Sequence, residues 1–173
     1  MAITEKCSPW LWAGDASEMV VAQIAGTQTW TAPTPVYVST SGTVKVCVDS
    51  DTDAEVAIYG FAYADAAAPT ANTEIYVAKI REDQLWAIWV SNGGNDSAAA
   101  QTIVGDMYGH SVETTAAPYV GYMTLDLALT SYKSMYVEDI VSNLNTKLVA
   151  SVSTSPGAAI VRFPASVLNT VLA

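Results

Sequence analysis

The stretch Asn72–Asn95, with the sequence NTEIYVAKIREDQLWAIWVSNGGN, decides how the rest of the chain is interpreted. Two apolar runs, 75–80 and 85–90, flank the polar tetrapeptide 81–84, and the second run ends at a Ser-Asn-Gly-Gly-Asn cluster that typically interrupts regular structure. Short runs rich in β-branched and aromatic residues, bounded by such signals, predict a β-hairpin. We therefore expect 75–80 and 85–90 to be two paired strands.

Both faces of this predicted hairpin are apolar. Trp86 and Ile88 alternate with Ala87 and Trp89, whereas a half-solvated strand carries polar residues on one face. The second face must therefore be covered, either by another part of the same chain or by another chain.

Working outward, the same strand and turn signals recur along the sequence. The runs 36–40 and 43–49 flank a predicted tight turn at Ser41-Gly42, and 18–25 reads better as a strand than as a helix. The strand predicted over 55–64 has Gly60 at its middle, which indicates a bulge or a close backbone approach. Many short strands without a long helix predict an all-β fold, a single antiparallel β-barrel or β-sandwich.

The domain organisation that follows is an extended N-terminal arm, 1–17, and one β-rich domain, 18–173. The arm carries Trp10 and Trp12 without an evident core of its own. Tryptophan is costly to leave in water. Two alternatives follow: the arm docks on a neighbouring subunit, or it folds back over its own barrel.

The composition excludes several function classes. Seven Lys and Arg against 17 Asp and Glu give a formal net charge of −10, so we expect no direct contact with nucleic acid, which needs a basic surface. No apolar run approaches the roughly 18–20 residues of a membrane helix, and no secretory signal opens the chain. The lack of a secretory signal leads us to expect a protein made in the cytoplasm. Hydrophobic residues make up 51% and charged residues 14%, which indicates much surface buried between subunits.

Candidates for chemistry are few. The only histidine, His110, lies in a predicted loop, and although Ser111 and Asp106 are near it in the sequence, no nucleophile elbow accompanies them. The acidic run Asp49–Glu55 lacks the Gly and Glu positions of a calcium loop, and the two cysteines fit neither a zinc site nor a disulfide framework. We expect no catalysis, no metal and no cofactor.

The aromatic residues support two readings, a sugar-binding groove or packing in cores and subunit contacts, and strand aromatics favour the second. The aromatics considered are Trp30, Tyr59, Tyr63, Tyr76, Trp86, Trp89, Tyr108, Tyr119 and Tyr122. As candidate contacts with another subunit or a partner we select Trp10, Trp12, Trp30, Tyr76, Trp86 and Trp89.

Across about residues 26–168 the sequence resembles the head decoration, or cement, proteins of tailed bacteriophages. The resemblance rests on the words APTPVYVSTSGTVKVC and AIYGFAYADA in the front half, then TEIYVAKIREDQLWAIWV, QTIVGDMYG, YMTLDL, MYVEDI and AIVRFPASVL. The first of these words lacks the glycine that usually precedes Pro-Val in the family, and the arm 1–17 is not covered.

The resemblance implies a structural virion protein without enzymatic activity. Such a protein would sit on the outer surface of the capsid, often as a homotrimer, and would stabilise contacts between subunits of the major capsid protein. The alternative is a fibre-associated or glycan-binding β-domain on the virion surface. A small hydrolase using His110 is a third reading, of another class.

Overall fold

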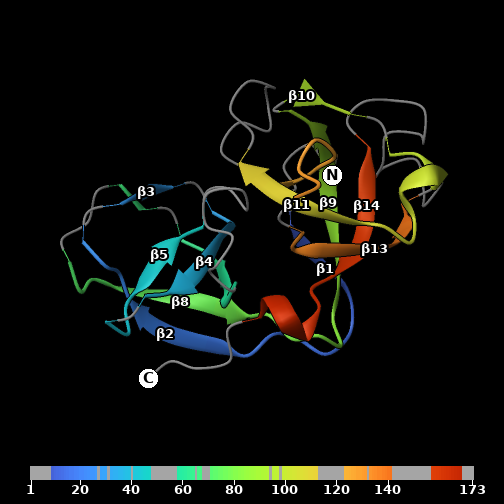
Figure 1. Cartoon of the computed structure of the whole chain (residues 1–173). Helices are drawn as coiled ribbons and strands as arrows, with labels where there is room; N and C mark the ends of the chain where they lie inside the picture. Colours follow the sequence, from blue (N-terminus) through green and yellow to red (C-terminus); the bar gives the residue numbers. More distant parts are fainter. Residues whose placement is uncertain are drawn as a thin grey trace, which may run out of the picture.

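The computed structural model describes residues 9–26, 28–30, 32–39, 41–47, 58–64, 66–67, 71–93, 95–97, 99–112, 123–131, 133–141 and 157–168. This part of the chain is all-β, as the sequence predicts: it contains fourteen strands and two short 3₁₀ helices. Figure 1 shows a barrel and a curled sheet that lie side by side. The calcium-loop comparison at Asp49–Glu55 falls outside the described residues.

The barrel is a five-stranded sheet with the strand order β2-β8-β6-β4-β5, in which all neighbours are antiparallel. A parallel bridge between Ile24, just after β2, and Val44 of β5 brings the two end strands together. Alternate residues of these strands point inward and form one apolar cluster. The strands are β2 (Met19–Gln23), β4 (Thr34–Val38), β5 (Val44–Val46), β6 (Gly60–Ala62) and β8 (Glu74–Lys79).

The curled sheet has the order β1-β9-β12-β11-β13-β14, and β14 also pairs with β9, so the sheet closes on itself. The pairing of β9 with β12 is parallel, and β10 pairs antiparallel with the C-terminal end of β9. The strands are β1 (Trp10–Ala13), β9 (Leu85–Asn92), β10 (Asn95–Asp96), β11 (Met107–Val112), β12 (Met123–Asp126), β13 (Met135–Ile140) and β14 (Ala158–Arg162).

Three smaller elements complete the described part. A two-stranded sheet joins β3 (Thr29–Trp30) to β7 (Ala66–Ala67) beside the barrel. The 3₁₀ helices are η1 (Gln101–Ile103) and η2 (Ala165–Val167).

The predicted hairpin of 75–80 with 85–90 is wrong, although both runs are strands. β8 pairs with β2 and β6 in the barrel, whereas β9 pairs with β1, β12 and β14 in the curled sheet. Both edges of each strand are therefore occupied by partners distant in the sequence. The tetrapeptide 81–84 is a crossing between the two sheets and not a hairpin turn.

Two local expectations are confirmed. β4 and β5 form a hairpin around Ser41-Gly42, in which the Ser39 N–H donates to the Thr43 carbonyl at 2.7 Å and Gly42 has a φ of 78°. Gly60 lies where two backbones approach, because a Cβ at this position would collide with the carbonyl oxygen of Ala78 on β8.

The two sheets share a junction of buried aromatic rings. Phe61 of β6 packs edge-on against Trp86 of β9 and against Phe163, which follows β14, with ring centroids 4.8 and 5.8 Å apart. The three rings belong to one buried cluster that runs into the interior of the curled sheet. The described part of the chain also returns to the barrel after β14, where Leu168 forms a parallel bridge with Ile58.

Candidate binding surface

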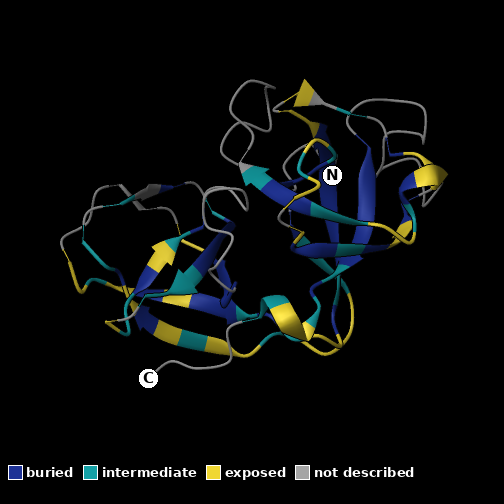
Figure 2. Ribbon diagram, viewed as in Figure 1, coloured by how far each residue is buried: buried dark blue, intermediate teal, exposed yellow. Residues whose placement is uncertain are grey.

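Four large apolar side chains in the described part of the chain are exposed, and they lie together on the outer face of the barrel. Their exposed fractions are 52% for Met19, 54% for Val21, 46% for Tyr63 and 62% for Tyr76. We call this set the apolar patch. Figure 2 shows the corresponding exposed and half-buried segments along β2 and β8, on the outside of the barrel.

The strand register explains why these side chains share a face. Val21 of β2 is directly opposite Tyr76 of β8, and directly opposite residues of antiparallel strands project to the same side. Met19 lies two residues before Val21 and therefore projects to that side as well. The neighbours Val20 and Val77 point the other way, into the core of the barrel.

Tyr63 extends the patch across β8. It follows the last residue of β6, and its N–H donates to the Tyr76 carbonyl at 3.3 Å. Since Ala62 pairs with Val77, Tyr63 lies opposite Tyr76 and its ring shares the outer face. Val21, Tyr76 and Tyr63 thus form one apolar row across three neighbouring strands.

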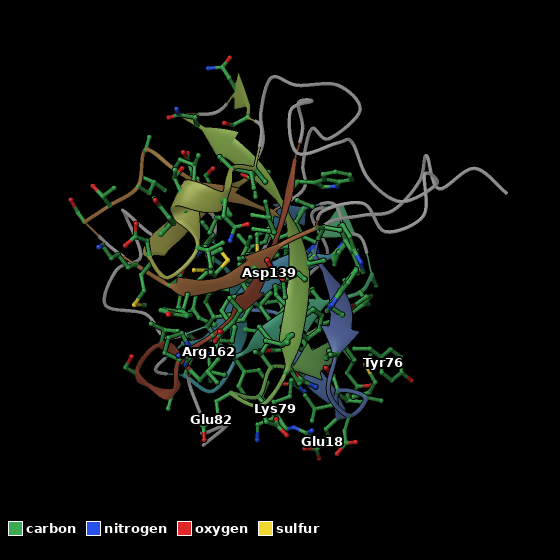
Figure 3. The ribbon with its side chains drawn as sticks, turned by 90° about the vertical axis from the view of Figure 1, so that its right-hand side faces the viewer. Glu18, Tyr76, Lys79, Glu82, Asp139 and Arg162 are labelled. Atoms are coloured by element: carbon green, nitrogen blue, oxygen red, sulfur yellow. The ribbon has the colours of Figure 1, made fainter. Side chains whose placement is uncertain are left out.

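Charged residues lie at both ends of the β2 segment. Glu18 precedes the strand, and Glu74 is opposite Gln23 at the other end; neither carboxylate has an ion pair in the described part of the chain. Lys79, opposite Glu18, holds its ammonium 5.9 Å from the centre of the Tyr59 ring. Burial, and second the charge of Glu18, raise the pKa of the Tyr59 phenol above 10.0. Figure 3 labels Tyr76 at the right of the ribbon and Glu18 and Lys79 at its lower end.

The six aromatic residues predicted as contacts occupy different environments. Tyr76 alone among them is exposed, whereas Trp30 and Trp86 are 7% and 1% exposed and belong to the interiors of the barrel and of the curled sheet. The indole N–H of Trp30 donates to the Ala64 carbonyl at 2.9 Å. The candidate surface therefore narrows to Tyr76 and its neighbours.

The remaining three tryptophans pack against one another on the second face of β9. Trp10 of β1 meets Trp89 edge-on, with ring centroids 5.6 Å apart, and Trp12 packs against the same buried cluster. For β9, the apolar second face is thus covered by the same chain. Within the predicted arm, residues 10–13 fold back on their own β9; residues 1–8 lie outside the described part.

The sequence predicts His110 in a loop, and this is wrong. His110 lies in the strand β11, where its exposed fraction is 1%. Its Nε2 lies 3.2 Å from the carbonyl oxygen of Cys47 and its Nδ1 lies 3.1 Å from the Ser134 hydroxyl. A carbonyl only accepts hydrogen bonds, so Nε2 carries the proton towards Cys47. This bond links the curled sheet to the residue that follows β5 of the barrel.

A second buried polar group is Asp126, at the end of β12. One of its carboxylate oxygens accepts hydrogen bonds from the N–H groups of Gly93 and Ala128, at 2.8 and 2.9 Å, and the other accepts from Ser111 at 3.1 Å. These bonds hold the loops after β9 and β12, so Asp126 has a structural role. Among the described residues, no group of three or more His, Cys, Asp or Glu side chains is arranged to hold a metal ion.

Sequence reasoning did not select Met19, Val21 or Tyr63. The signal was present in 18–25, where consecutive apolar residues give the strand two apolar faces, as in 85–90. Which face is covered depends on partners distant in the sequence, so the alternation alone does not separate the buried Val20 from the exposed Val21.

Comparisons with known proteins add no neighbour: no family model, no curated protein and no solved structure matches the chain. None of the helices in the described ranges has the length and apolar character needed to cross a membrane.

Proposed function

We propose that this protein is a structural protein of a tailed-bacteriophage head, without enzymatic activity, that binds the outer capsid surface and stabilises contacts between major capsid protein subunits. One support is the resemblance of residues 26–168 to head decoration proteins. The observation that carries the proposal is the apolar patch: the exposed large apolar side chains of the described part gather on one strip of one barrel.

The size of the patch fits this role. Four roughly half-exposed side chains offer a small apolar surface, whereas a stable pairwise interface buries about 800 Å² per partner. A contact that is weak singly becomes strong when many copies, or the subunits of a trimer, bind a symmetric shell together. The proposal therefore includes self-association, as a homotrimer, in the bound state.

The first test is the copy number of this chain in purified particles, measured by mass spectrometry against the major capsid protein. Near-equal copies support a protein that covers the whole lattice, and a few copies per particle point to a vertex or tail position. Absence from particles overturns the proposal.

The second test is attachment of the Tyr76→Ser variant to shells that lack this protein. We expect the loss of one central aromatic contact to weaken attachment at least about tenfold, because aromatic anchors dominate such interfaces. The matched control is Tyr136→Ser, a tyrosine of β13 outside the patch whose ring packs against the Arg162 guanidinium at 4.6 Å. If Tyr76→Ser attaches to the shells as strongly as Tyr136→Ser, the apolar patch is not part of the interface.

Glycan binding is the second candidate function, and the adjacent exposed rings of Tyr63 and Tyr76 favour it. Aromatic faces side by side can stack on sugar rings. Binding to a glycan array that is lost in both Tyr63→Ala and Tyr76→Ala would support this function. Failure of the folded wild-type protein to bind any glycan would exclude it for the sugars tested.

A further inference from the structure

The turn after β9 contains the only Asn-Gly pair of the chain, Asn92-Gly93. In such a pair the glycine nitrogen can attack the side-chain Cγ of the asparagine, because glycine has no Cβ to hinder the approach. The new N–C bond closes a succinimide ring, and the side-chain amide nitrogen leaves as ammonia together with the proton of the glycine N–H. Water then opens the ring and leaves aspartate or isoaspartate at position 92. The Asn92 side chain is exposed, so water reaches it.

The hairpin of β9 with β10 holds the reacting atoms in an unproductive arrangement. Asn92 is the last residue of β9 and pairs with Asn95 of β10, so its backbone is extended. Ring closure requires the Gly93 nitrogen to eclipse the Asn92 Cβ about the Cα–C bond, and the strand ψ of about +135° turns the nitrogen away from that position. The Nδ2 of Asn95 also donates to the Gly93 carbonyl at 3.3 Å, which adds a bond within the turn.

Asp126 binds the attacking nitrogen itself. The Gly93 N–H donates to Asp126 Oδ1 at 2.8 Å, and the same oxygen accepts from the Ala128 N–H at 2.9 Å. The carboxylate is buried, and its second oxygen accepts from the Ser111 hydroxyl at 3.1 Å, so its position is fixed. The Gly93 nitrogen must lose its proton before it attacks, and a hydrogen bond to a negatively charged acceptor makes that loss harder.

These two restraints oppose the same reaction in different ways. The paired backbone keeps the Gly93 nitrogen out of line with the Asn92 Cγ, and Asp126 keeps the proton on that nitrogen. Both restraints are lost together when the turn 92–95 separates from β12, and local opening of this kind is common at the ends of strands. We propose that Asn92 is a deamidation site that the folded turn protects and that local opening of the turn exposes to reaction.

The modification also prevents the turn from closing again. Isoaspartate adds one methylene to the main chain, so the pairing of residue 92 with Asn95 and the bond of Gly93 to Asp126 no longer fit one register. Either product adds one negative charge to a chain whose net charge is already −10. The extent of modification thus reports how often this end of the curled sheet has opened. The inference does not depend on the proposed function.

The test compares the full wild-type chain with the synthetic peptide Val-Ser-Asn-Gly-Gly-Asn, which has the sequence of residues 90–95. Both are incubated at mildly alkaline pH, and mass spectrometry with peptide mapping follows the deamidation of Asn92. We expect the chain to react at least about tenfold more slowly than the peptide. The slowing should be no smaller than the protection of the Gly93 N–H in hydrogen exchange measured by NMR, because both reactions need the opening that releases this N–H.

Three variants assign the effect to named groups. Asp126→Asn puts a neutral amide oxygen in place of the charged acceptor and should raise the deamidation rate of Asn92 about three- to tenfold. The matched control Ser111→Ala removes a bond to the other carboxylate oxygen and keeps the bond to Gly93, so the rate should change little. Asn92→Gln should remove the modification from this turn, because the longer side chain would have to close a larger ring.

Each remaining outcome contradicts the proposal. Deamidation of the folded chain at the rate of the peptide would show that the turn gives no protection. A slower reaction in Asp126→Asn would mean that the carboxylate assists the attack as a base, and an unchanged rate would mean that its charge does not hold the Gly93 N–H. If Asp126→Asn does not fold, the comparison of the wild-type chain with the peptide and with hydrogen exchange at Gly93 decides alone.

Discussion

Gln84 offers a strong test of how the barrel and the curled sheet are held together. Its side chain is fully buried within the polar tetrapeptide that crosses between the two sheets. The Oε1 atom accepts from the Arg81 N–H at 3.0 Å, and Nε2 donates to the Asp15 carbonyl at 2.9 Å and to the Ser17 hydroxyl at 3.1 Å. One amide therefore joins the crossing 81–84 to the earlier crossing between β1 and β2.

The substitution Gln84→Leu keeps much of the volume and removes all three hydrogen bonds. A net contribution of about 1 kcal/mol for each bond gives a loss of about 3 kcal/mol. Because the partner groups are only partly buried, water can replace some bonds, and we expect a decrease of about 2–3 kcal/mol in the free energy of unfolding. With a urea m-value of about 2 kcal/mol/M, the unfolding midpoint should fall by at least about 1 M.

The substitution Gln84→Glu separates the two halves of the amide. It keeps an acceptor for the Arg81 N–H but turns an acceptor oxygen towards the Asp15 carbonyl and buries a charge. We expect it to destabilise the fold more than Gln84→Leu at neutral pH, by about 3 kcal/mol or more. Protonation restores a donor, so the folded state binds the proton more tightly and the deficit should shrink as the pH falls through the pKa of the new carboxyl.

Urea unfolding followed by tryptophan fluorescence measures these effects, with Glu82→Gln as the control in the same turn. Glu82 is exposed, and its substitution should change the free energy of unfolding by less than about 0.5 kcal/mol. If Gln84→Leu also stays within that limit, the bonds of Gln84 do not hold the crossings and the reasoning is refuted.

Three further predictions concern the barrel and the junction. Gly60→Ala should cost at least about 2 kcal/mol in urea unfolding, because its Cβ would meet the main chain of β8, which cannot move without disturbing the ladder. Trp86→Phe should change the free energy of unfolding by less than about 1 kcal/mol, because the loss of buried apolar area is offset by removing a buried indole N–H that has no acceptor among the described residues. Trp86→Ala should lower the free energy of unfolding by about 3–5 kcal/mol in the same assay. The raised pKa of Tyr59 means that the unfolded chain loses this proton first, so stability should fall as the pH rises above about 10; Glu18→Gln should make that fall shallower in unfolding midpoints measured at alkaline pH.

The sequence predicted the all-β class because strand and turn signals are local. The hairpin at Ser41-Gly42 depends on residues within ten positions, and the close approach at Gly60 follows from a glycine inside a strand. Both are confirmed. Turn chemistry and residue alternation are thus sufficient where the partner strand is the next one along the chain.

Pairing between distant segments was not predictable in this way. β9 takes β1 on one edge, about 75 residues earlier, and β14 on the other, about 70 residues later. Neither partner is indicated by a local signal, so the nearest apolar run, β8, was the natural but wrong choice. His110 was misplaced for the same reason: its burial depends on Cys47, which is 63 residues away.

The same limit explains why the sequence could indicate that a candidate binding surface exists but could not locate it. Two apolar faces on 75–80 and 85–90 indicated that something must cover the second face of each strand. For β9 the tryptophans of β1 do so, whereas the outer faces of β2 and β8 stay exposed at Val21 and Tyr76. A uniform pattern in the sequence thus divides into an internal contact and an exposed surface, and only the exposed part can bind a partner.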